Sequence, residues 1–403
     1  MIDFSPPRID KKTVEAVAKV MFSGWITTGP KTKEFEQKIA DYCHVPKVLC
    51  VASATAGLEL ILRWFGVKEG DEVIVPAYTY CATANVIIHC GATPVMVDIC
   101  DDFTINVQRI QTAITSRTKV IIPVDIGGYP ADYDVINALV KSPEVKALFK
   151  AESPEQQLLG RILVMADAAH SFGALYKGKT CGSFTDITVF SFHAIKNLTT
   201  AEGGANCFNL PDVFDIELIY KQFYCKILHG QSKDAYTKLH GSWRYDVLEA
   251  GYKCNMTDIL AAIGVVEIDR YKDDMLVKRK SIFERYTKAF SKIPSVIIPP
   301  YESDEKTSSY HLYLLRVNNI TEEVRDAIIQ QIFDNEVAVN VHFIPLPMLT
   351  VYKNMGYQIE DYPQTYQNYS CEISIPVYYD LTDQEVETVI KMVSRAIIDK
   401  TQN

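Results

Sequence analysis

The sequence predicts an α/β protein with a mainly parallel central sheet in a large domain, residues 1–280, and a smaller α+β domain, residues 281–403. Over the first two-thirds of the chain, short continuous apolar runs alternate with helical stretches, which is typical of parallel strands covered on both faces. After about residue 280, strands and helices follow one another in a different order. The length of 403 residues also agrees with two domains.

The strands expected in the large domain are short and apolar. They are residues 47–53, 71–76, 93–99, 118–126, 161–169, 186–192 and 204–209. The stretches 56–65 and 80–90 read as helices between the first of these strands, and 256–271 and 278–290 carry apolar residues at spacings of three and four. The charged stretch 141–160 lies between a helix and a strand, and we interpret it as a surface insertion.

The elements expected in the smaller domain begin with a strand over 309–317 and a capped helix over 321–333. A second strand is predicted over 336–343. A closing helix follows in "TDQEVETVIKMVSRAI", with Thr382 as its N-cap.

Composition excludes several classes of protein. The net charge of −9, without a basic stripe, argues against a nucleic-acid-binding protein. No stretch approaches 18 uninterrupted apolar residues, so no membrane span is expected. The N-terminus lacks the apolar core of a signal peptide, and the ten cysteines are scattered, so we expect a cytoplasmic protein with reduced thiols. The eight histidines form no recognisable metal-ligand set.

One lysine, Lys196, lies in the run "FSFHAIKNLTTAEGGANCF". Taken alone, such a lysine is most often an ordinary loop residue. A lysine amine becomes a nucleophile for carbonyl groups when burial or neighbouring cations lower its pKa. The neighbours expected around Lys196 therefore decide between the two interpretations.

Other candidate residues follow predicted strands. Asp167 ends an apolar strand, where it either caps the next turn or pairs with a protonated pyridine nitrogen. Ser53, Ala54 and Thr55 join a strand to a helix, an arrangement that can bind a phosphate group. Tyr78 and Tyr80 come after another strand, where an aromatic ring either packs in the core or stacks on a flat cofactor.

Together these features suit pyridoxal 5′-phosphate, and their order along the chain resembles one family. The chain is similar to the fold-type-I, aspartate-aminotransferase-like enzymes of the DegT/StrS family, which act on nucleotide-linked keto sugars. The resemblance covers nearly the whole chain. Its most specific pieces are "SGWITTGPKTKEFE", "PAYTYCATAN", "DAAHSFGALYKGK", "SFHAIKNLTTAEGG" and "GYKCNMTDILAAIG".

The resemblance implies roles for individual residues around the cofactor. Lys196 would hold pyridoxal phosphate covalently, Asp167 would face its pyridinium nitrogen, and His170 would lie near its phenolic oxygen. Tyr80 would stack on the ring. The phosphate would be contacted by Ala54, Thr55 and Ser191.

The segment "GYKCNMTD" resembles one that reaches across a homodimer interface to the partner's phosphate. Many relatives carry asparagine where this chain has Lys253 and arginine where it has Asn255. Either of these two residues could make the contact. Because the segment would reach the phosphate bound by a neighbouring copy, we expect a homodimer with shared active sites.

The resemblance also suggests where the substrate binds. The stretch "SGWITTGP" is similar to a lid over the sugar-nucleotide pocket, which makes Trp25, Thr28 and Lys31 candidate contacts. The alternative is a plain Gly-Pro turn between two helices. His342 matches a position near the substrate. Two departures, Pro347 and Asp125 at positions that often hold histidine, affect only the detailed substrate assignment.

The activity that the resemblance implies is a two-stage transamination. L-Glutamate would donate its amino group, and the acceptor would be a nucleotide-linked keto sugar, with UDP-linked 4-keto-6-deoxyhexoses for surface polysaccharides as the best match. Three alternative functions would leave other signs in the sequence. Dehydratases of the same fold replace the lysine by histidine, a nicotinamide oxidoreductase would need a GxGxxG motif that is absent, and a catalytically silent relative would lack Lys196 or Asp167.

Overall fold

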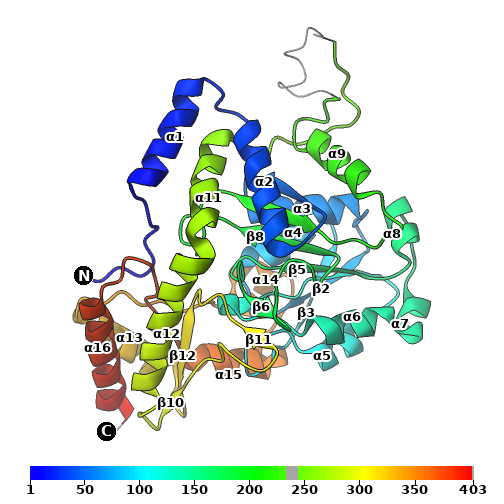
Figure 1. The fold of residues 1–403 in the computed structure, drawn as a ribbon. Coiled ribbons are helices and arrows are strands. Elements are labelled where there is room, and N and C mark those ends of the chain that lie inside the picture. Colours follow the sequence, from blue (N-terminus) through cyan, green and yellow to red (C-terminus); the bar gives the residue numbers. More distant parts are fainter. Residues whose placement is uncertain (233–243, 402–403) are drawn as a thin grey trace.

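The structure, a computed structural model, describes residues 1–232 and 244–401 and is organised around a seven-stranded sheet (Figure 1). Across the sheet the strands come in the order β1, β9, β8, β5, β4, β2, β3. Strand β9 runs antiparallel to both of its neighbours, and the remaining neighbouring pairs are parallel. This confirms the predicted mainly parallel α/β sheet. The strands are β1 (Lys47–Val51), β2 (Glu72–Pro76), β3 (Thr93–Val97), β4 (Thr118–Ile121), β5 (Leu163–Asp167), β8 (Ile187–Ser191) and β9 (Gly204–Phe208).

Helices cover both faces of this sheet, as the continuous apolar strands require. In β2, Val73 and Val75 pack into one apolar cluster, whereas Ile74 between them points into a cluster on the opposite face. The helices of this part of the chain are α1 (Lys11–Ser23), α2 (Pro30–Cys43), α3 (Ala54–Trp64), α4 (Cys81–His89), α5 (Val107–Ala113), α6 (Tyr133–Lys141), α7 (Pro143–Leu148), α8 (Pro154–Leu159), α9 (Ile216–Lys226) and α11 (Asp258–Arg270). Short turns of helix are η1 (Ile126–Gly128) and η2 (Tyr271–Met275).

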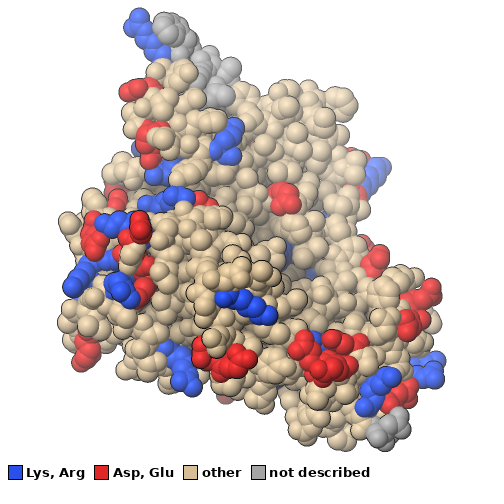
Figure 2. Space-filling view, turned by 180° about the vertical axis from the view of Figure 1, so that it is seen from behind, with Lys and Arg blue, Asp and Glu red and all other residues tan. Residues whose placement is uncertain are grey.

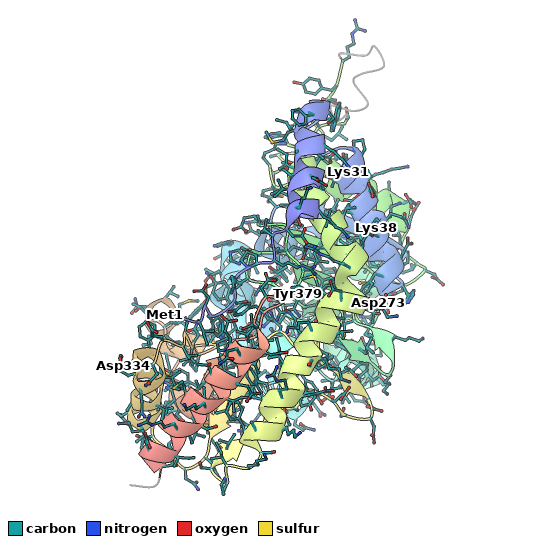
Figure 3. The ribbon with its side chains drawn as sticks, turned by 60° about the vertical axis from the view of Figure 1, so that its left-hand side comes forward. Met1, Lys31, Lys38, Asp273, Asp334 and Tyr379 are labelled. Atoms are coloured by element: carbon teal, nitrogen blue, oxygen red, sulfur yellow. The ribbon has the colours of Figure 1, made fainter. Side chains whose placement is uncertain are left out.

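Helices α1, α2 and α11 lie side by side along one edge of the molecule (Figures 1 and 3). Lys38 on α2 forms an ion pair of 2.6 Å with Asp269 on α11. Helix α2 begins at Pro30, and the carboxylate of Asp258, the first residue of α11, accepts the backbone N–H groups of Gly29 and Lys31. A carboxylate at a helix N-terminus satisfies otherwise free donors, so it fixes α2 against α11.

The C-terminal part has its own three-stranded antiparallel sheet, β10-β12-β13, and its own apolar cluster. Its elements are α12 (Leu276–Phe290), β10 (Val296–Ile297), β12 (Tyr313–Val317), α13 (Glu322–Asp334), η3 (Leu346–Met348), α14 (Thr350–Asn354), η4 (Ile359–Asp361), α15 (Pro363–Cys371), β13 (Glu372–Ile375) and α16 (Asp383–Thr401). A further small sheet joins β11 (Lys306–Thr307) to β6 (Leu175–Tyr176) and β7 (Lys179–Thr180). Helix α12 runs through residue 280, so the predicted domain boundary falls inside a helix.

Thr382 caps the closing helix α16 as predicted. Its hydroxyl accepts the backbone N–H of Glu385 at 3.2 Å, and the Glu385 carboxylate accepts the backbone N–H of Thr382 at 2.8 Å. This reciprocal pair is a capping box, and it satisfies two backbone donors at the start of the helix.

The prediction of a strand over 336–343 is wrong. This segment makes only isolated bridges, between Val337 and Ile2 and between Asn340 and Ser374. The backbone N–H of His342 instead donates to the side chain of Glu372. Only Asn340 pairs its backbone with the neighbouring strand β13, so the segment forms a single bridge there and not a ladder.

The charged stretch 141–160 forms two short helices, α7 and α8. Each begins with a serine N-cap, Ser142 and Ser153, followed by proline. Gln156 is buried, and its side-chain amide donates to the carbonyl of Phe65 at 2.8 Å. The segment is therefore attached to the body of the protein through buried contacts.

The outer surface carries charges of both signs. On the face in Figure 2, lysine and arginine side chains alternate with aspartate and glutamate, and no continuous basic stripe crosses it. Among the helices of residues 1–232 and 244–401, none is long and apolar enough to cross a membrane.

Candidate active site

A cavity of about 320 Å³ opens where β1, β5 and β8 end. The carboxyl ends of parallel strands are the usual ligand-binding edge of such a sheet. The sequence-predicted residues in its wall are Ala54, Thr55, Tyr80, Asp167, His170, Ser191, Lys196 and His342. The structure thus brings the predicted cofactor residues of one chain together at a single cavity.

Lys196 enters the cavity from the turn that follows β8. Its backbone N–H donates to the carbonyl of His193 at 2.9 Å, which holds the turn. Burial lowers the pKa of the Lys196 amine from 10.5 to about 8, although the charge of Asp167 opposes this shift. A substantial fraction of the amine is therefore neutral near physiological pH, as a nucleophile or proton acceptor requires.

Asp167 ends β5 and is buried. Burial raises the pKa of its carboxyl, while hydrogen bonds from the Thr83 hydroxyl at 2.8 Å and the Ala169 backbone N–H at 3.2 Å lower it. The charge of Lys196 also lowers the pKa of this carboxyl, but among the described residues Asp167 forms no ion pair. A buried carboxylate with two hydrogen-bond donors and no paired cation suits the protonated nitrogen of a pyridine ring.

The N-terminus of α3 forms another part of the wall. The Ser53 hydroxyl accepts the backbone N–H of Ala56 at 3.1 Å and so caps the helix. Ala54 and Thr55, the first residues of α3, line the cavity, and the first N–H groups of a helix have no partner within it. A Cβ atom at Gly204 would lie 2.5 Å from the Ala54 nitrogen, so only glycine allows this close approach of β9 to the helix. Free N–H groups and the positive end of a helix dipole fit a phosphate group.

His170 presents a defined tautomer. Its Nδ1 accepts the backbone N–H of Gly127 at 3.2 Å, so in the neutral ring the proton lies on Nε2. Burial, together with Lys196 and His342, holds the pKa of His170 well below its usual range. The ring is therefore a neutral hydrogen-bond donor, which suits a phenolic oxygen.

Tyr80 stands at the mouth of the cavity, with 59% of its surface exposed. The nearest aromatic ring is that of Phe343, whose centroid lies 5.6 Å away at a tilt of 48°. The open face of Tyr80 can therefore stack on a flat ring. Tyr78, the other aromatic candidate of this stretch, is fully buried in a core cluster, so it takes the packing role.

Sequence reasoning missed His311, which also lies in the wall. Its Nδ1 is 2.8 Å from the Asn197 side-chain oxygen, and the Asn197 amide donates to Ser309. The centroids of the His311 and His170 rings are 4.5 Å apart. The sequence does contain a signal for this residue: a histidine just before the apolar strand β12. Such a position rarely needs a polar ring for packing, which would have suggested a role in the site.

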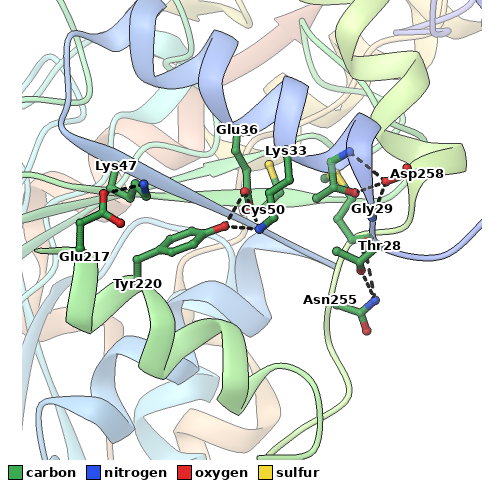
Figure 4. A network of polar contacts seen from close by, with 12 residues as sticks. Thr28, Gly29, Lys33, Glu36, Lys47, Cys50, Glu217, Tyr220, Asn255 and Asp258 are labelled. Carbon is green, nitrogen blue, oxygen red and sulfur yellow. Dashed lines mark hydrogen bonds and ion pairs between the residues drawn. The ribbon is translucent and has the colours of Figure 1, made fainter. Parts of the chain in front are cut away.

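Apart from His342, the candidate substrate and partner contacts lie outside the cavity wall of the described chain. Thr28 is buried, and its hydroxyl donates to the carbonyl of Met256 and accepts from the Asn255 amide, each at 2.5 Å (Figure 4). Trp25 donates to the Thr28 carbonyl at 3.2 Å, and Lys31 pairs with Glu34 at 2.6 Å. The Gly-Pro stretch thus forms the turn between α1 and α2.

The segment that carries Lys253 and Asn255 runs beside the end of β1. The Ala52 backbone N–H donates to the carbonyl of Cys254 at 2.7 Å, and Asn255 forms a bridge with Val51. The Asn255 side chain is buried, whereas Lys253 is exposed. Their roles toward a partner subunit stay predictions.

The structure also places the two departures noted in the sequence. Asp125 is buried and is not part of the cavity wall, and its carboxylate accepts the hydroxyl groups of Tyr133 and Ser171, each at 2.5 Å. It therefore supports the turn that carries His170. Pro347 is part of the helical turn η3. Among the described residues, no group of histidine, cysteine, aspartate and glutamate is placed to hold a metal ion.

A mainly parallel sheet places an amine, a buried carboxylate and a helix N-terminus around one cavity. This is the arrangement of the aspartate-aminotransferase-like enzymes, which depend on pyridoxal phosphate. The model of the DegT/DnrJ/EryC1/StrS aminotransferase family matches residues 7–152 and 159–394, and the chain belongs to this family. The match is interrupted at residues 153–158, inside the predicted insertion. The protein is a sugar aminotransferase.

Individual relatives agree with this assignment. The spore coat polysaccharide biosynthesis protein SpsC of Bacillus subtilis is 37% identical over 399 residues, which cover 97% of this chain and 96% of SpsC. The putative sugar aminotransferase Spr1654 of Streptococcus pneumoniae, solved in its PMP-form, is 45% identical with a TM-score of 0.95 over 99% of this chain and 100% of that chain. Helicobacter pylori PseC, an aminotransferase of pseudoaminic acid biosynthesis, is 25% identical with a TM-score of 0.82 over 99% of each chain.

Proposed function

We propose that this enzyme transfers the amino group of L-glutamate to a nucleotide-linked keto sugar, with a UDP-linked 4-keto-6-deoxyhexose as the preferred acceptor, for surface polysaccharide biosynthesis. The observation that carries the proposal is the pairing of an amine of lowered pKa, Lys196, with a buried carboxylate, Asp167, at one cavity. The likeness to SpsC and PseC supports a role in making surface sugars.

Each cofactor residue then has a defined task. When bound, pyridoxal phosphate supplies a protonated ring that withdraws electrons from the reacting carbon. Lys196 holds the cofactor between turnovers and, once free, takes the proton from the Cα of the amino donor. Asp167 keeps the ring nitrogen protonated. His170 donates from Nε2 to the phenolic oxygen, and Tyr80 covers one face of the ring.

The phosphate group would be held by the N-terminus of α3 and the end of β8. Ala54 and Thr55 offer backbone N–H groups, and Ser191 offers its hydroxyl. Gly204 pairs with Ser191 on one side and with Val51, next to the α3 turn, on the other. The two parts of the phosphate site are thereby held at a fixed separation.

We infer that the active enzyme is a homodimer in which Lys253 or Asn255 of one subunit contacts the phosphate of the other. Large apolar side chains at the end of α1 support this assembly, since Met21 is 60% and Phe22 91% exposed. Exposed apolar residues of this size are typical of interfaces. Trp25, Thr28 and Lys31 lie in the turn after α1, so a partner subunit or a closing motion would bring them to the substrate.

A dehydratase of the same fold is the alternative function. That reaction is associated with histidine in place of the lysine, and Lys196 in the cavity favours transamination instead. A silent relative would lack one of the two central residues, and the chain has both.

The test is the amination of a panel of dTDP-, UDP- and GDP-linked keto sugars with glutamate, with the new amine located by NMR. We expect a 4-amino product from the UDP-linked 4-keto-6-deoxyhexose and visible absorption that borohydride bleaches. Lys196→Ala should fold but neither absorb nor turn over, and Lys177→Ala, an exposed lysine, is the matched control. Turnover by Lys196→Ala, or an enzyme that aminates no nucleotide sugar, would contradict the proposal.

A further inference from the structure

Three buried side chains form a continuous hydrogen-bonded path to the wall of the cavity. Glu372 and Ser374 lie two residues apart on β13, so their side chains share one face of the strand. The Ser374 hydroxyl is 2.5 Å from Glu372 Oε1 and 2.9 Å from His342 Nδ1. His342 lies in the cavity wall, so the path joins a fully buried carboxyl group to the site.

The path is held rigidly. The backbone N–H of His342 donates to Glu372 Oε2 at 3.0 Å, and the backbones of Asn340 and Ser374 exchange hydrogen bonds of 2.8 and 3.0 Å. Phe4 stacks on the His342 ring, with centroids 5.3 Å apart and an interplanar angle of 20°. Within residues 1–232 and 244–401, the ring of His342 has one hydrogen-bond partner, Ser374, which bonds to Nδ1. The other nitrogen, Nε2, is available to a ligand in the cavity that His342 lines.

The position of one proton decides the direction of both hydrogen bonds. A hydroxyl group has a single proton, so Ser374 can donate to Glu372 or to His342 but not to both. When Glu372 is protonated, it donates to Ser374, Ser374 donates to Nδ1, and the ring carries its proton on Nε2. When Glu372 is ionised, both bonds reverse, Nδ1 carries the proton and Nε2 is a bare acceptor.

The surroundings favour a protonated carboxyl at neutral pH. Burial raises the pKa of Glu372 to about 8, against the hydrogen bonds from Ser374 and the His342 backbone and the charges of Arg325 and Arg316. Tyr78 also faces this carboxyl. Among the described residues no cation forms an ion pair with Glu372.

The histidine ring stays neutral in both arrangements. Burial and the charge of Lys196 lower the pKa of His342 to about 4. His170 and His311 face the same cavity, and the pKa of each is held well below its usual range. The proton that moves is therefore the carboxyl proton of Glu372, passed along the path.

We propose that Glu372, Ser374 and His342 form a proton relay that serves the reacting oxygen and nitrogen atoms of the substrates. The proposal rests on the proposed transamination. The keto oxygen of the sugar needs two protons to leave as water. One comes from the amine that attacks the carbonyl carbon, as the C–N bond forms, and the other is the Nε2 proton of His342, taken as the C–O bond breaks. In the same step Nδ1 takes the hydroxyl proton of Ser374, and Ser374 takes the carboxyl proton of Glu372, which is left as a carboxylate.

The other half-reaction restores the relay. The ammonium group of the amino donor must lose a proton before its nitrogen can attack, and Nε2 accepts that proton. The Nδ1 proton then returns to Ser374, and the Ser374 proton returns to Glu372. Over one complete cycle the relay gains and loses one proton, and no other reactant is consumed. His342 is the catalytic residue, and Ser374 and Glu372 position its protons.

The direct test is nitrogen NMR of the purified holoenzyme labelled with ¹⁵N-histidine, because protonated and bare ring nitrogens differ in chemical shift. The His342 signals are identified by their loss in His342→Gln. We expect Nε2 to be protonated at pH 6.5 and Nδ1 at pH 9, with a midpoint near 8. In Glu372→Gln the amide donates to Ser374 at every pH, so Nε2 should stay protonated. A tautomer that ignores pH in the parent, or that still switches in Glu372→Gln, would overturn the relay.

Kinetics provides a second readout. Ser374→Ala should lower kcat about a hundredfold and leave KM within about threefold, since acid–base assistance contributes roughly 10²–10⁴-fold to rates. Ser374→Thr keeps the hydroxyl and should recover most of the rate. Ser370→Ala, in which the lost hydroxyl bonds only to the carbonyl of Gln367 among described residues, is the control and should match the parent. Equal kcat in Ser374→Ala and Ser370→Ala would refute the proposal.

The two lines of evidence separate this inference from the proposed function. The tautomer switch needs no sugar substrate, so an enzyme that switches but aminates no nucleotide sugar would contradict the proposed function alone. An enzyme that aminates nucleotide sugars without a switch would contradict the relay alone. If Ser374→Ala fails to fold, the Glu372→Gln spectra decide the matter.

Discussion

Replacing Glu372 by glutamine should stabilise the protein above pH 8 and change its stability little at pH 5. The pKa of this carboxyl is about 8 in the fold against an ordinary value of 4.5. A raised pKa means that the folded state holds a proton that the unfolded state releases between pH 4.5 and 8, so stability falls as pH rises through this window. At ~1.4 kcal/mol for each pKa unit, the full loss is on the order of 5 kcal/mol.

Glutamine cannot ionise, but it keeps an acceptor for the His342 backbone N–H and a donor for Ser374. The variant should therefore escape this loss and unfold at a temperature several degrees above that of the parent at pH 8.5, while the two melt together at pH 5. Thermal melts followed by circular dichroism at both pH values measure the difference. Glu360→Gln, at an exposed glutamate, is the control. A Glu372→Gln variant that is less stable than the parent at pH 8.5 would refute the reasoning.

The other predictions concern the cofactor site. Lys196 is a free amine only after the amino donor has bound, and its pKa is then about 8, so kcat should rise with pH through 8. Asp167→Asn removes the charge that raises this pKa, so it should shift that limb of the pH profile of kcat to lower pH and cut kcat at least a hundredfold. An unshifted limb or a parental rate would contradict the coupling. Thr83→Val removes the hydroxyl that donates to Asp167 at 2.8 Å, so spectrophotometric titration should show pyridoxal phosphate bound several-fold more weakly. Parental affinity would show that this hydrogen bond has no part in holding the cofactor. Gly204→Ala places a Cβ 2.5 Å from the Ala54 nitrogen, so it should lower cofactor affinity at least tenfold while the far-ultraviolet circular dichroism spectrum stays unchanged. Normal affinity would argue against a phosphate site at this helix.

The sequence was sufficient to locate the residues that stand at the ends of apolar strands. Asp167 ends β5 and Lys196 follows β8, and a parallel sheet brings such strand ends to one edge whatever the details of the loops. The helix start at Ala54 could be predicted in the same way, because its serine cap is local. These predictions depend on short-range patterns and one general rule of topology.

Other parts of the site depend on contacts that a sequence pattern does not contain. The segment 336–343 has strand-like composition, but its backbone bonds to the side chain of Glu372, which comes 30 residues later in the chain. His311 reaches the cavity through Asn197, more than a hundred residues away. Thr28 was predicted from its motif alone, and its hydroxyl is occupied by Met256 and Asn255. In each case a polar contact between residues far apart in the sequence determines where the residue or segment lies.

The antiparallel strand β9 has a consequence for how this catalytic apparatus can change. Gly204, its first residue, is paired to Val51 on one side and to Ser191 on the other, so strand pairing holds the two sides of the proposed phosphate site. The loop 192–203, which carries the reactive lysine, is closed at both ends by that pairing. Changes in the loop that keep Lys196 in the cavity should therefore leave the dimensions of the proposed phosphate site unchanged.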